Sequence, residues 1–271
     1  MQFNNPTSTK NKTKNMTTIH LRKSNISCRL APALIVLVAV AILIPWSAQA
    51  STITTIDVPS ADLTAVQGTN AKGDLVGFWN DATSSHGFLF AKGVFLTFDV
   101  PGAADTAGRG INSRGDIVGE YDLDGITAHG YLPSGNSFTT IDFPGALDTL
   151  PNAINASGDI VGLYDNGVNT HGFLVDKHGQ FTTIDFPGAT DTLVYGVNDK
   201  GDIVGTYFDT AGFNHGFLLS KGNSSTIEPP GASTSQARGI NSSGDIVGTF
   251  GGDSFLFSGG TFTVTDVPGP T

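Results

Sequence analysis

The chain has 271 residues, of which only 14% are charged, while 35 are glycine and 13 are proline. This composition excludes a long coiled coil, and the 39% of hydrophobic residues excludes a charge-rich disordered chain. Acidic residues outnumber Lys and Arg by 24 to 14, which argues against nucleic acid as a partner.

Residues 1–50 have the layout of a secretory signal peptide. They contain six Lys and Arg and no acidic residue, and an apolar run over residues 30–45 is followed by the small-residue sequence that ends at Ala50. The run is interrupted by Pro32 and is shorter than the roughly 20 residues of a spanning helix. We therefore predict cleavage after Ala50, no membrane span after cleavage, and a secreted or periplasmic protein.

The mature chain, residues 51–271, is predicted to be one acidic repeat domain. It holds all 24 acidic residues but only eight of the 14 Lys and Arg. The single cysteine, Cys28, lies in the predicted signal peptide, so neither disulfides nor a Cys-based metal or thiol site is expected in the mature domain.

Three motifs recur along residues 51–271. The sequence Gly-Asp-(Ile/Leu)-Val-Gly begins at intervals of 42, 43, 43 and 43 residues, at Gly73, Gly115, Gly158, Gly201 and Gly244. An acid-x-Pro element has its acid at Asp57, Asp99, Asp142, Asp185, Glu228 and Asp266. The sequence His-Gly-(Phe/Tyr)-Leu begins at His86, His129, His171 and His215, with Asp253 at the fifth position.

Each unit reads as four short antiparallel strands. In the second unit, Asn112 opens a tight turn that Gly115 closes, so the segments on either side form a hairpin. The His-Gly-Phe-Leu segment is the third strand, and a stretch such as Phe138–Asp142 is the fourth, ended by Pro144. Four strands in about 43 residues is the size of one propeller blade. Five copies predict an all-β, five-bladed β-propeller.

The ends of the predicted ring leave one strand too many. Six acid-x-Pro elements frame five units, so either Ile53–Val58 or Phe262–Val267 completes the last blade and the other is extra.

The combination Gly-Ile-Asn-x-x-Gly-Asp-Ile-Val-Gly followed by His-Gly-Phe-Leu resembles the bacterial "probable extracellular repeat, HAF family", over nearly all of the mature chain. The resemblance implies export and repeats, but no activity or site residues. This chain differs by having glycine where the family name implies alanine, at Gly87, Gly130, Gly172 and Gly216.

Residues that recur in every blade are predicted to serve the blade. The Asp after each turn glycine is expected to accept hydrogen bonds from turn amides, and the Asp-Thr pairs at Asp105, Asp148 and Asp191 to cap the loops between blades. These Asp residues are Asp74, Asp116, Asp159, Asp202 and Asp245. The four histidines are interpreted as hydrogen-bonded groups between blades, in preference to a ring of metal ligands. The row Trp79, Tyr121, Tyr164, Tyr207 and Phe250 is expected to pack between blades in preference to stacking on sugars.

Most length variation among the units falls in the loop between the second and third strands. We predict that these loops share one face and form the binding surface. Their candidate binding residues are Asp81, Glu120, Asp122, Asp124, Asp165 and Asp209. Carboxylates beside aromatic rings favour a carbohydrate or a surface protein as the partner. No cofactor is predicted, although a faint calcium-loop pattern at Asp122–Gly125 keeps calcium open.

Two functions therefore stay open. The first is an exported, non-catalytic propeller that binds a ligand or another surface. The alternative is a glycan-cleaving enzyme that uses loop carboxylates, with Glu120 and Asp124 facing another acid across a cleft. We name no catalytic residue, because the sequence contains no Gly-x-Ser-x-Gly elbow, phosphate loop or His-Glu-x-x-His helix.

Overall fold

The computed structural model describes residues 54–134 and 137–265. The predicted signal peptide and its cleavage site lie outside these residues, so both stay predictions. Among the described residues, no helix has the length and apolar character needed to cross a membrane.

The described chain consists of five four-stranded antiparallel sheets, each formed by consecutive strands. Blade 1 comprises β1 (Leu63–Thr69), β2 (Leu75–Asn80), β3 (Ser85–Ala91) and β4 (Val94–Phe98). Blade 2 comprises β5 (Asp105–Ile111), β6 (Ile117–Asp122), β7 (Ala128–Ser134) and β8 (Ser137–Ile141). Blade 3 comprises β9 (Asp148–Ile154), β10 (Ile160–Asp165), β11 (Thr170–Val175) and β12 (Phe181–Ile184).

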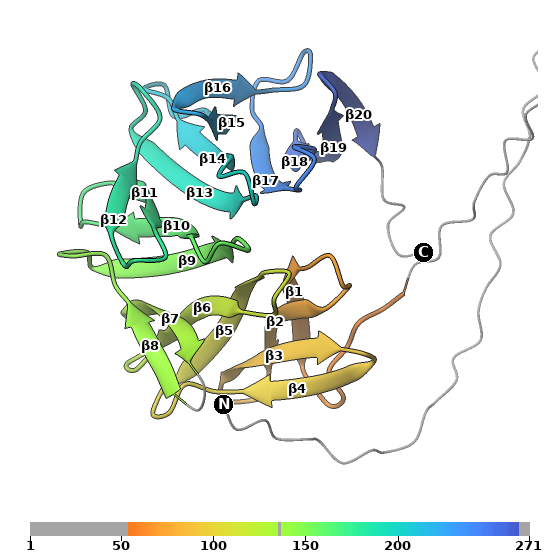
Figure 1. Ribbon diagram of the computed structural model, residues 1–271, viewed down its shortest axis with the longest axis vertical. Helices are drawn as coiled ribbons and strands as arrows, with labels where there is room; N and C mark the ends of the chain where they lie inside the picture. Colours follow the sequence, from red (N-terminus) through yellow and green to blue (C-terminus); the bar gives the residue numbers. More distant parts are fainter. Residues whose placement is uncertain (1–53, 135–136, 266–271) are drawn as a thin grey trace, which may run out of the picture. The chain divides into compact units, whose positions relative to one another are not determined.

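Blade 4 comprises β13 (Asp191–Val197), β14 (Ile203–Phe208), β15 (Asn214–Ser220) and β16 (Asn223–Ile227). Blade 5 comprises β17 (Gln236–Ile240), β18 (Ile246–Phe250), β19 (Asp253–Ser258) and β20 (Thr261–Thr265). The blades follow one another in chain order, with β1, β5, β9, β13 and β17 innermost (Figure 1). The prediction of a five-bladed β-propeller is confirmed.

The structure also answers which terminal segment completes the last blade. The C-terminal candidate forms β20, which pairs with β19. The described part of the N-terminal candidate, residues 54–58, forms no strand and leads into β1.

The hydrophobic core lies at the junctions between neighbouring blades. Each of the first four blades contributes a valine from its second strand that is 0% exposed, namely Val76, Val118, Val161 and Val204. Val161 shares one buried cluster with Val194 of the next blade, and Val204 shares another with Ala237. Each of the four buried clusters therefore combines side chains of two neighbouring sheets.

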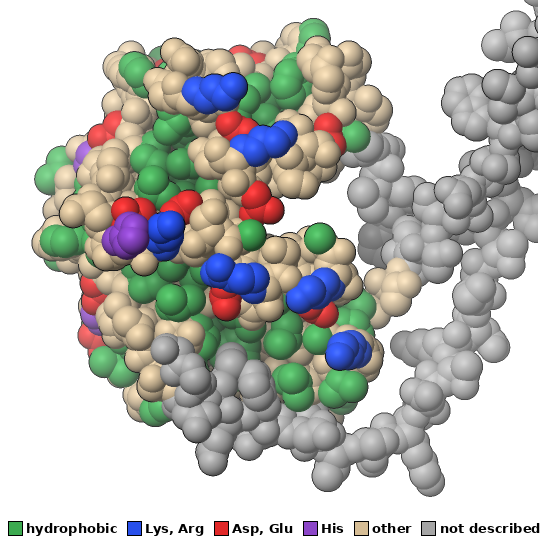
Figure 2. All heavy atoms as spheres, in the orientation of Figure 1, with side chains coloured by type: hydrophobic (Ala, Val, Ile, Leu, Met, Phe, Trp, Pro, Cys, Tyr) green, Lys and Arg blue, Asp and Glu red, His purple; other side chains and the backbone are tan. Residues whose placement is uncertain are grey.

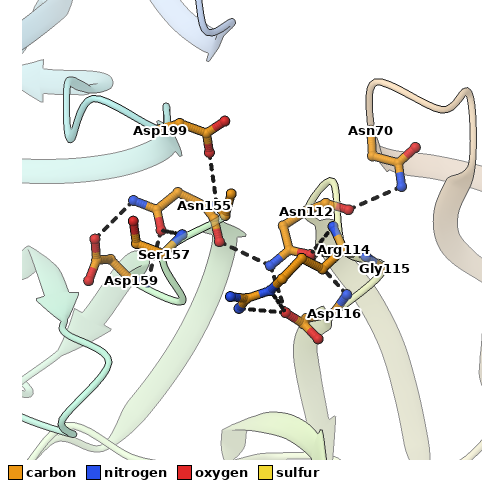
Figure 3. Close-up of polar contacts among 10 residues, drawn as sticks. Asn70, Asn112, Arg114, Gly115, Asp116, Asn155, Ser157, Asp159 and Asp199 are labelled. Carbon is orange, nitrogen blue, oxygen red and sulfur yellow. Dashed lines mark hydrogen bonds and ion pairs between the residues drawn. The ribbon is translucent and has the colours of Figure 1, made fainter.

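Asparagine side chains connect each blade to the next near the innermost strands (Figure 3). In blade 2, Asn112 Oδ1 accepts hydrogen bonds from the backbone N–H groups of Arg114, Gly115 and Asp116. Asn112 Nδ2 donates both to Asp116 Oδ2 and to the Asn155 carbonyl oxygen of blade 3, at 2.8 and 3.0 Å.

The same arrangement repeats, so four side-chain amides each donate to the asparagine carbonyl of the following blade. The donor-to-acceptor pairs are Asn70 to Asn112, Asn112 to Asn155, Asn155 to Asn198 and Asn198 to Asn241. We call this set the asparagine ladder.

The predicted role of the repeated Asp residues was wrong in one detail. The turn amides are bound by asparagine Oδ1, and each Asp carboxylate accepts instead from the asparagine Nδ2. At Asp116, burial alone would raise the pKa, but the hydrogen bonds from Asn112 and Arg114 lower it. The carboxylate thus orients the asparagine amide that bridges the blades.

Asp-Thr pairs at the start of β5, β9 and β13 bind the loops between blades, as the sequence predicted. Asp105 of blade 2 accepts a hydrogen bond from the backbone N–H of Ser85 in blade 1, and Thr106 Oγ1 accepts one from the Val100 N–H. Asp148 and Asp191 form the corresponding bonds in later junctions.

Packing explains why glycine stands before the aromatic residue of the third strand. A Cβ atom at Gly87 would lie 2.3 Å from the Phe98 ring, and one at Gly172 would lie 2.5 Å from Val194. Because the fourth strand or the next blade already fills this space, alanine would require those neighbours to move.

Candidate functional site

In four of the five blades, side chains of the loop between the second and third strands accept hydrogen bonds from amides of that loop. Asp81 accepts from Thr83 and Ser84, and Asp124 from the N–H groups of Ile126 and Thr127. Asp122 accepts from the Gly125 N–H, Asp165 from the Gly167 N–H, and Asp209 from the N–H groups of Ala211 and Phe213. The turn of blade 5, Gly251-Gly252, contains no acid. The loop acids therefore belong to blades 1 to 4, and Asp122 is the one that lines a pocket together with Glu120.

Each histidine of the row bonds to a loop of its own blade, and not between two blades as the sequence suggested; His86, His171 and His215 each bridge two loops, whereas His129 bonds to Asp142. His86 Nδ1 lies 2.9 Å from Asp99 of the acid-x-Pro loop, and its Nε2 lies 3.4 Å from Asp81. His215 joins Glu228 and Asp209 in the same manner. The prediction was wrong because the acid-x-Pro residue follows the strand that pairs with the histidine strand.

The aromatic row covers these histidines and also reaches the neighbouring blade. The Trp79 and His86 rings stack with centroids 4.5 Å apart. Tyr164 of blade 3 stacks on Phe143 of blade 2 at 3.8 Å. Tyr164 and Tyr207 of the row therefore pack between blades, as the sequence predicted.

The pKa values of the His86 loop set a testable pH dependence. Burial lowers the pKa of His86, but Asp99 and Asp81 outweigh it, so the pKa lies above its ordinary value of 6.5. Hydrogen bonds from Thr83 and Ser84 lower the pKa of Asp81 from 3.8 to about 2. The stability from protonated His86 is complete below pH 6.5 and is lost as the pH rises through the folded value. The stability contributed by the ionised Asp81 carboxylate is lost only as the pH falls from 3.8 toward 2.

We therefore expect His86→Gln to lower the melting temperature more at a pH between these windows, about 5.5, than at about 9. The control is His178→Gln, because the His178 ring has no hydrogen bond among the described residues and only its backbone N–H bonds to Asp176. A His86→Gln effect that is equal at both pH values would contradict the assigned ion pairs.

One pocket departs from the repeat. It lies between blades 1 and 2, has a volume of about 270 Å³, and contains an ion pair between Arg109 of β5 and Glu120 of β6. Its wall is formed by Phe78, Ser85, Asp105, Thr106, Ala107, Tyr121, Asp122 and Ala128. Glu120 was predicted on the variable-loop face, but it lies within a strand and faces an arginine instead of another acid.

A β-bulge explains how Arg109 reaches this pocket. The pairing of β5 with β6 shifts between Gly108 and Gly110, so Arg109 has no partner residue on β6. Every innermost strand carries the equivalent bulge, and bulges redirect side chains. The five bulge residues are all polar, and only arginine occurs twice among them, namely Gln67, Arg109, Asn152, Tyr195 and Arg238.

The pocket is also unusual in its buried polar atoms. Arg109 Nε and Glu120 Oε2 are buried and have no hydrogen-bond partner within the described part of the chain. Such atoms are uncommon in folded proteins and call for a structural or functional reason. No other blade has a carboxylate at the Glu120 position, where Phe78, Leu163, Thr206 and Thr249 stand. The Arg109–Glu120 pair is thus the candidate site.

Charge is distributed unevenly between the two ends of the sheets. Six of the eight Lys and Arg of residues 51–271 lie in turns after first or third strands, and some are visible on the face in Figure 2. Within the described ranges, the loops at the opposite end contain no Lys or Arg. Those residues also contain no group of three or more His, Cys, Asp or Glu arranged to hold a metal ion.

No protein-family model matches the chain, and no curated protein does, so the resemblance to the HAF family stays a prediction. Solved structures show the same fold. A prolyl endopeptidase is 14% identical with a TM-score of 0.54, over 77% of this chain and 36% of its own. TolB from Acinetobacter baumannii is 13% identical with a TM-score of 0.52, over 72% of this chain and 51% of its own.

A lectin from Aleuria aurantia, in complex with Fucα1-6GlcNAc, is 13% identical with a TM-score of 0.45. That match covers 75% of this chain and 77% of the lectin. At these identities the likeness shows the β-propeller fold alone, and proteins of this fold differ in function.

Proposed function

We propose that this protein is an exported, non-catalytic binding module that holds a carbohydrate in the pocket between blades 1 and 2. The observation that carries the proposal is the Arg109–Glu120 pair, the one charged pair that interrupts the repeated strand positions in the described chain. Stacked repeats reuse the same contacts between neighbours, so a charged pair that occurs in a single blade is not one of the contacts that the repeated fold requires.

The side chains of the pocket suit a neutral, hydroxyl-rich ligand. Sugar hydroxyls both donate and accept, so they can bond to carboxylates such as Glu120 and to the guanidinium of Arg109. The rings of Phe78 and Tyr121 supply an apolar surface for the C–H face of a sugar. Asp105 and Asp122 add negative charge at the rim, which disfavours an anionic ligand. A volume of about 270 Å³ suits one or two sugar rings.

The same contacts favour binding over glycan cleavage. A glycosidase needs two carboxyl groups that flank the scissile bond, one of them protonated. Here Glu120 is paired with Arg109, Asp105 accepts from the Ser85 N–H, and Asp122 accepts from the Gly125 N–H. Asp124, the expected partner of Glu120, is engaged in closing its own loop.

A glycan array and polysaccharide pull-down with the purified protein test the proposal. The informative variant is Arg109→Asn/Glu120→Leu, which installs the residues of blade 3, where Asn152 and Leu163 already occupy these positions in a folded blade. Loss of the charged hydrogen bonds should weaken binding at least tenfold. The matched control is Arg238→Gln, the same bulge position outside the pocket, which should bind like the wild type.

Three results would count against the proposal. If the folded wild-type protein retains no glycan, carbohydrate is not its ligand. If the double variant binds as tightly as the wild type, the ligand does not bind in this pocket. Release of reducing ends from a bound polysaccharide would favour the enzyme, our alternative function.

A further inference from the structure

The first and last blades each present a face that every other blade buries. Val247 in blade 5 is 50% exposed, whereas its four counterparts in blades 1 to 4 are 0% exposed. Val66 in blade 1 is 44% exposed, whereas the matching Val194 and Ala237 are 0% exposed. We call the surface around Val247 the trailing face and the surface around Val66 the leading face.

The asparagine ladder ends at the same two faces. Asn241 Nδ2 bonds to Asp245, but within the described residues it lacks the onward acceptor that its four counterparts have. The Asn70 carbonyl receives no side-chain amide there, although the Asn112, Asn155, Asn198 and Asn241 carbonyls each receive one. The trailing face thus has an amide with an unused N–H where the leading face has a carbonyl that accepts hydrogen bonds only from its own blade within the described residues.

The two faces match each other, since every internal junction is formed by one trailing and one leading face. Val247 and Val66 together would reproduce the buried Val161–Val194 pair of the third junction. Residues 54–62 contact blade 1 in the way that the segment connecting two blades contacts the second of them. The Val58 N–H donates to Thr64 Oγ1 at 3.0 Å, as the Phe143 N–H does to Thr149.

Two substitutions make this fifth junction weaker than the other four. Leu63 stands where Asp105 binds an amide of the preceding blade, so that cross-blade hydrogen bond is lost. Thr69 stands where Ile111, Ile154, Val197 and Ile240 stand, which reduces the apolar area available. A junction that keeps its valines and its ladder groups but lacks these contacts can open and close.

We propose that the propeller has a closed state, in which the trailing face of blade 5 packs on the leading face of blade 1 of the same chain. Blades 1 and 5 lie on either side of the same opening (Figure 1). A second propeller docked on blade 5 would have to place its own following blades where blade 1 already lies. Because both faces belong to the same polypeptide, their effective concentration for each other is in the millimolar range, which favours contact within one chain.

Closure would complete the row of bulge residues. Arg238 of blade 5 already lies over the Tyr195 ring of blade 4, 4.4 Å from its centroid. A fifth junction would place Gln67 beside Arg238 in the same way, so that all five bulge residues become neighbours. The closed state therefore affects a row of polar residues that is not the same in every blade.

A cysteine pair tests the closed state in the full chain. Val66→Cys/Val247→Cys is made in a Cys28→Ser background, which removes the only native cysteine. Mild oxidation should give a disulfide-linked monomer that migrates faster without reductant and melts at a higher temperature. Disulfide-linked dimers and longer oligomers as the main product would overturn the proposal in favour of a second copy.

Spin labels on the same two cysteines provide a readout that needs no disulfide geometry. A closed population gives a short distance component like that of labels at positions 161 and 194, which face each other across a formed junction. A single long distance with no short component, together with free thiols after oxidation, would show that the two faces do not meet.

Discussion

Replacing Asn155 with alanine is expected to lower the free energy of unfolding by about 3 kcal/mol. Asn155 is 3% exposed and makes four hydrogen bonds. Alanine would leave the partly buried N–H groups of Ser157 and Asp159 and the Asn198 carbonyl without this partner. For a domain of this size, the melting temperature should fall by roughly 6–12 °C, measured by calorimetry or circular dichroism.

Asn241→Ala is the matched control, because Asn241 closes the same type of turn in blade 5. Its turn is exposed and its amide makes no onward bond in the described chain, so water can replace much of what alanine removes. We expect a loss of about 1 kcal/mol. Equal losses for Asn155→Ala and Asn241→Ala would mean that the ladder contributes nothing beyond its turns.

The ladder shows how far the sequence could lead. The constant spacing of Asn, Gly and Asp predicts a tight turn in each unit and hence the hairpin between first and second strands. It does not say which side chain binds the turn amides, since Asn and Asp side chains both accept hydrogen bonds from nearby N–H groups. Only asparagine also donates, and that second capacity, directed to the next blade, depends on how the sheets stack.

The candidate site was partly predictable. Glu120 drew attention because it is the one Glu outside the repeated positions, but its partner was not found. Counting back from the Asn112 turn with regular pairing would place Arg109 opposite Gly119. The bulge moves Gly119 opposite Gly108 and Glu120 opposite Ala107, which frees Arg109 to reach Glu120. Glycines inside a strand, such as Gly108 and Gly110, suggest a bulge, but they do not say where the side chain of the bulged residue points, so the pair could be recognised only in the structure.

The histidine row was within reach of the sequence. His86 precedes Gly87, which pairs with Phe98, and Asp99 follows Phe98 directly. The register alone therefore brings this histidine next to the acid of its own blade. The expectation of contacts between blades came from recurrence, which argues for a structural role but not for a particular interface.

Gly162→Ala is expected to have the largest effect of any single substitution considered for this chain. A Cβ atom at Gly162, the last glycine of the Gly-Asp-Ile-Val-Gly motif, would lie 2.1 Å from the Leu150 carbonyl oxygen and 2.8 Å from Pro151 Cα. Both are backbone atoms of β9, so the innermost strand itself would have to move. We expect a loss of more than about 4 kcal/mol and little folded protein at 37 °C, measured by denaturant unfolding.

The first glycine of the same motif provides the comparison. Gly158 has a φ of +94°, and a Cβ there would meet nothing closer than Arg114 Nη2 at 3.5 Å. Alanine at this position would bear the cost of a left-handed backbone but no steric clash, about 1 to 2 kcal/mol. The two variants add the same methyl group four residues apart, so their difference measures how closely β10 and β9 approach. If the Gly162→Ala protein is as stable as the Gly158→Ala protein, β9 and β10 must lie further apart than described. That result would contradict the tight packing around the innermost strands.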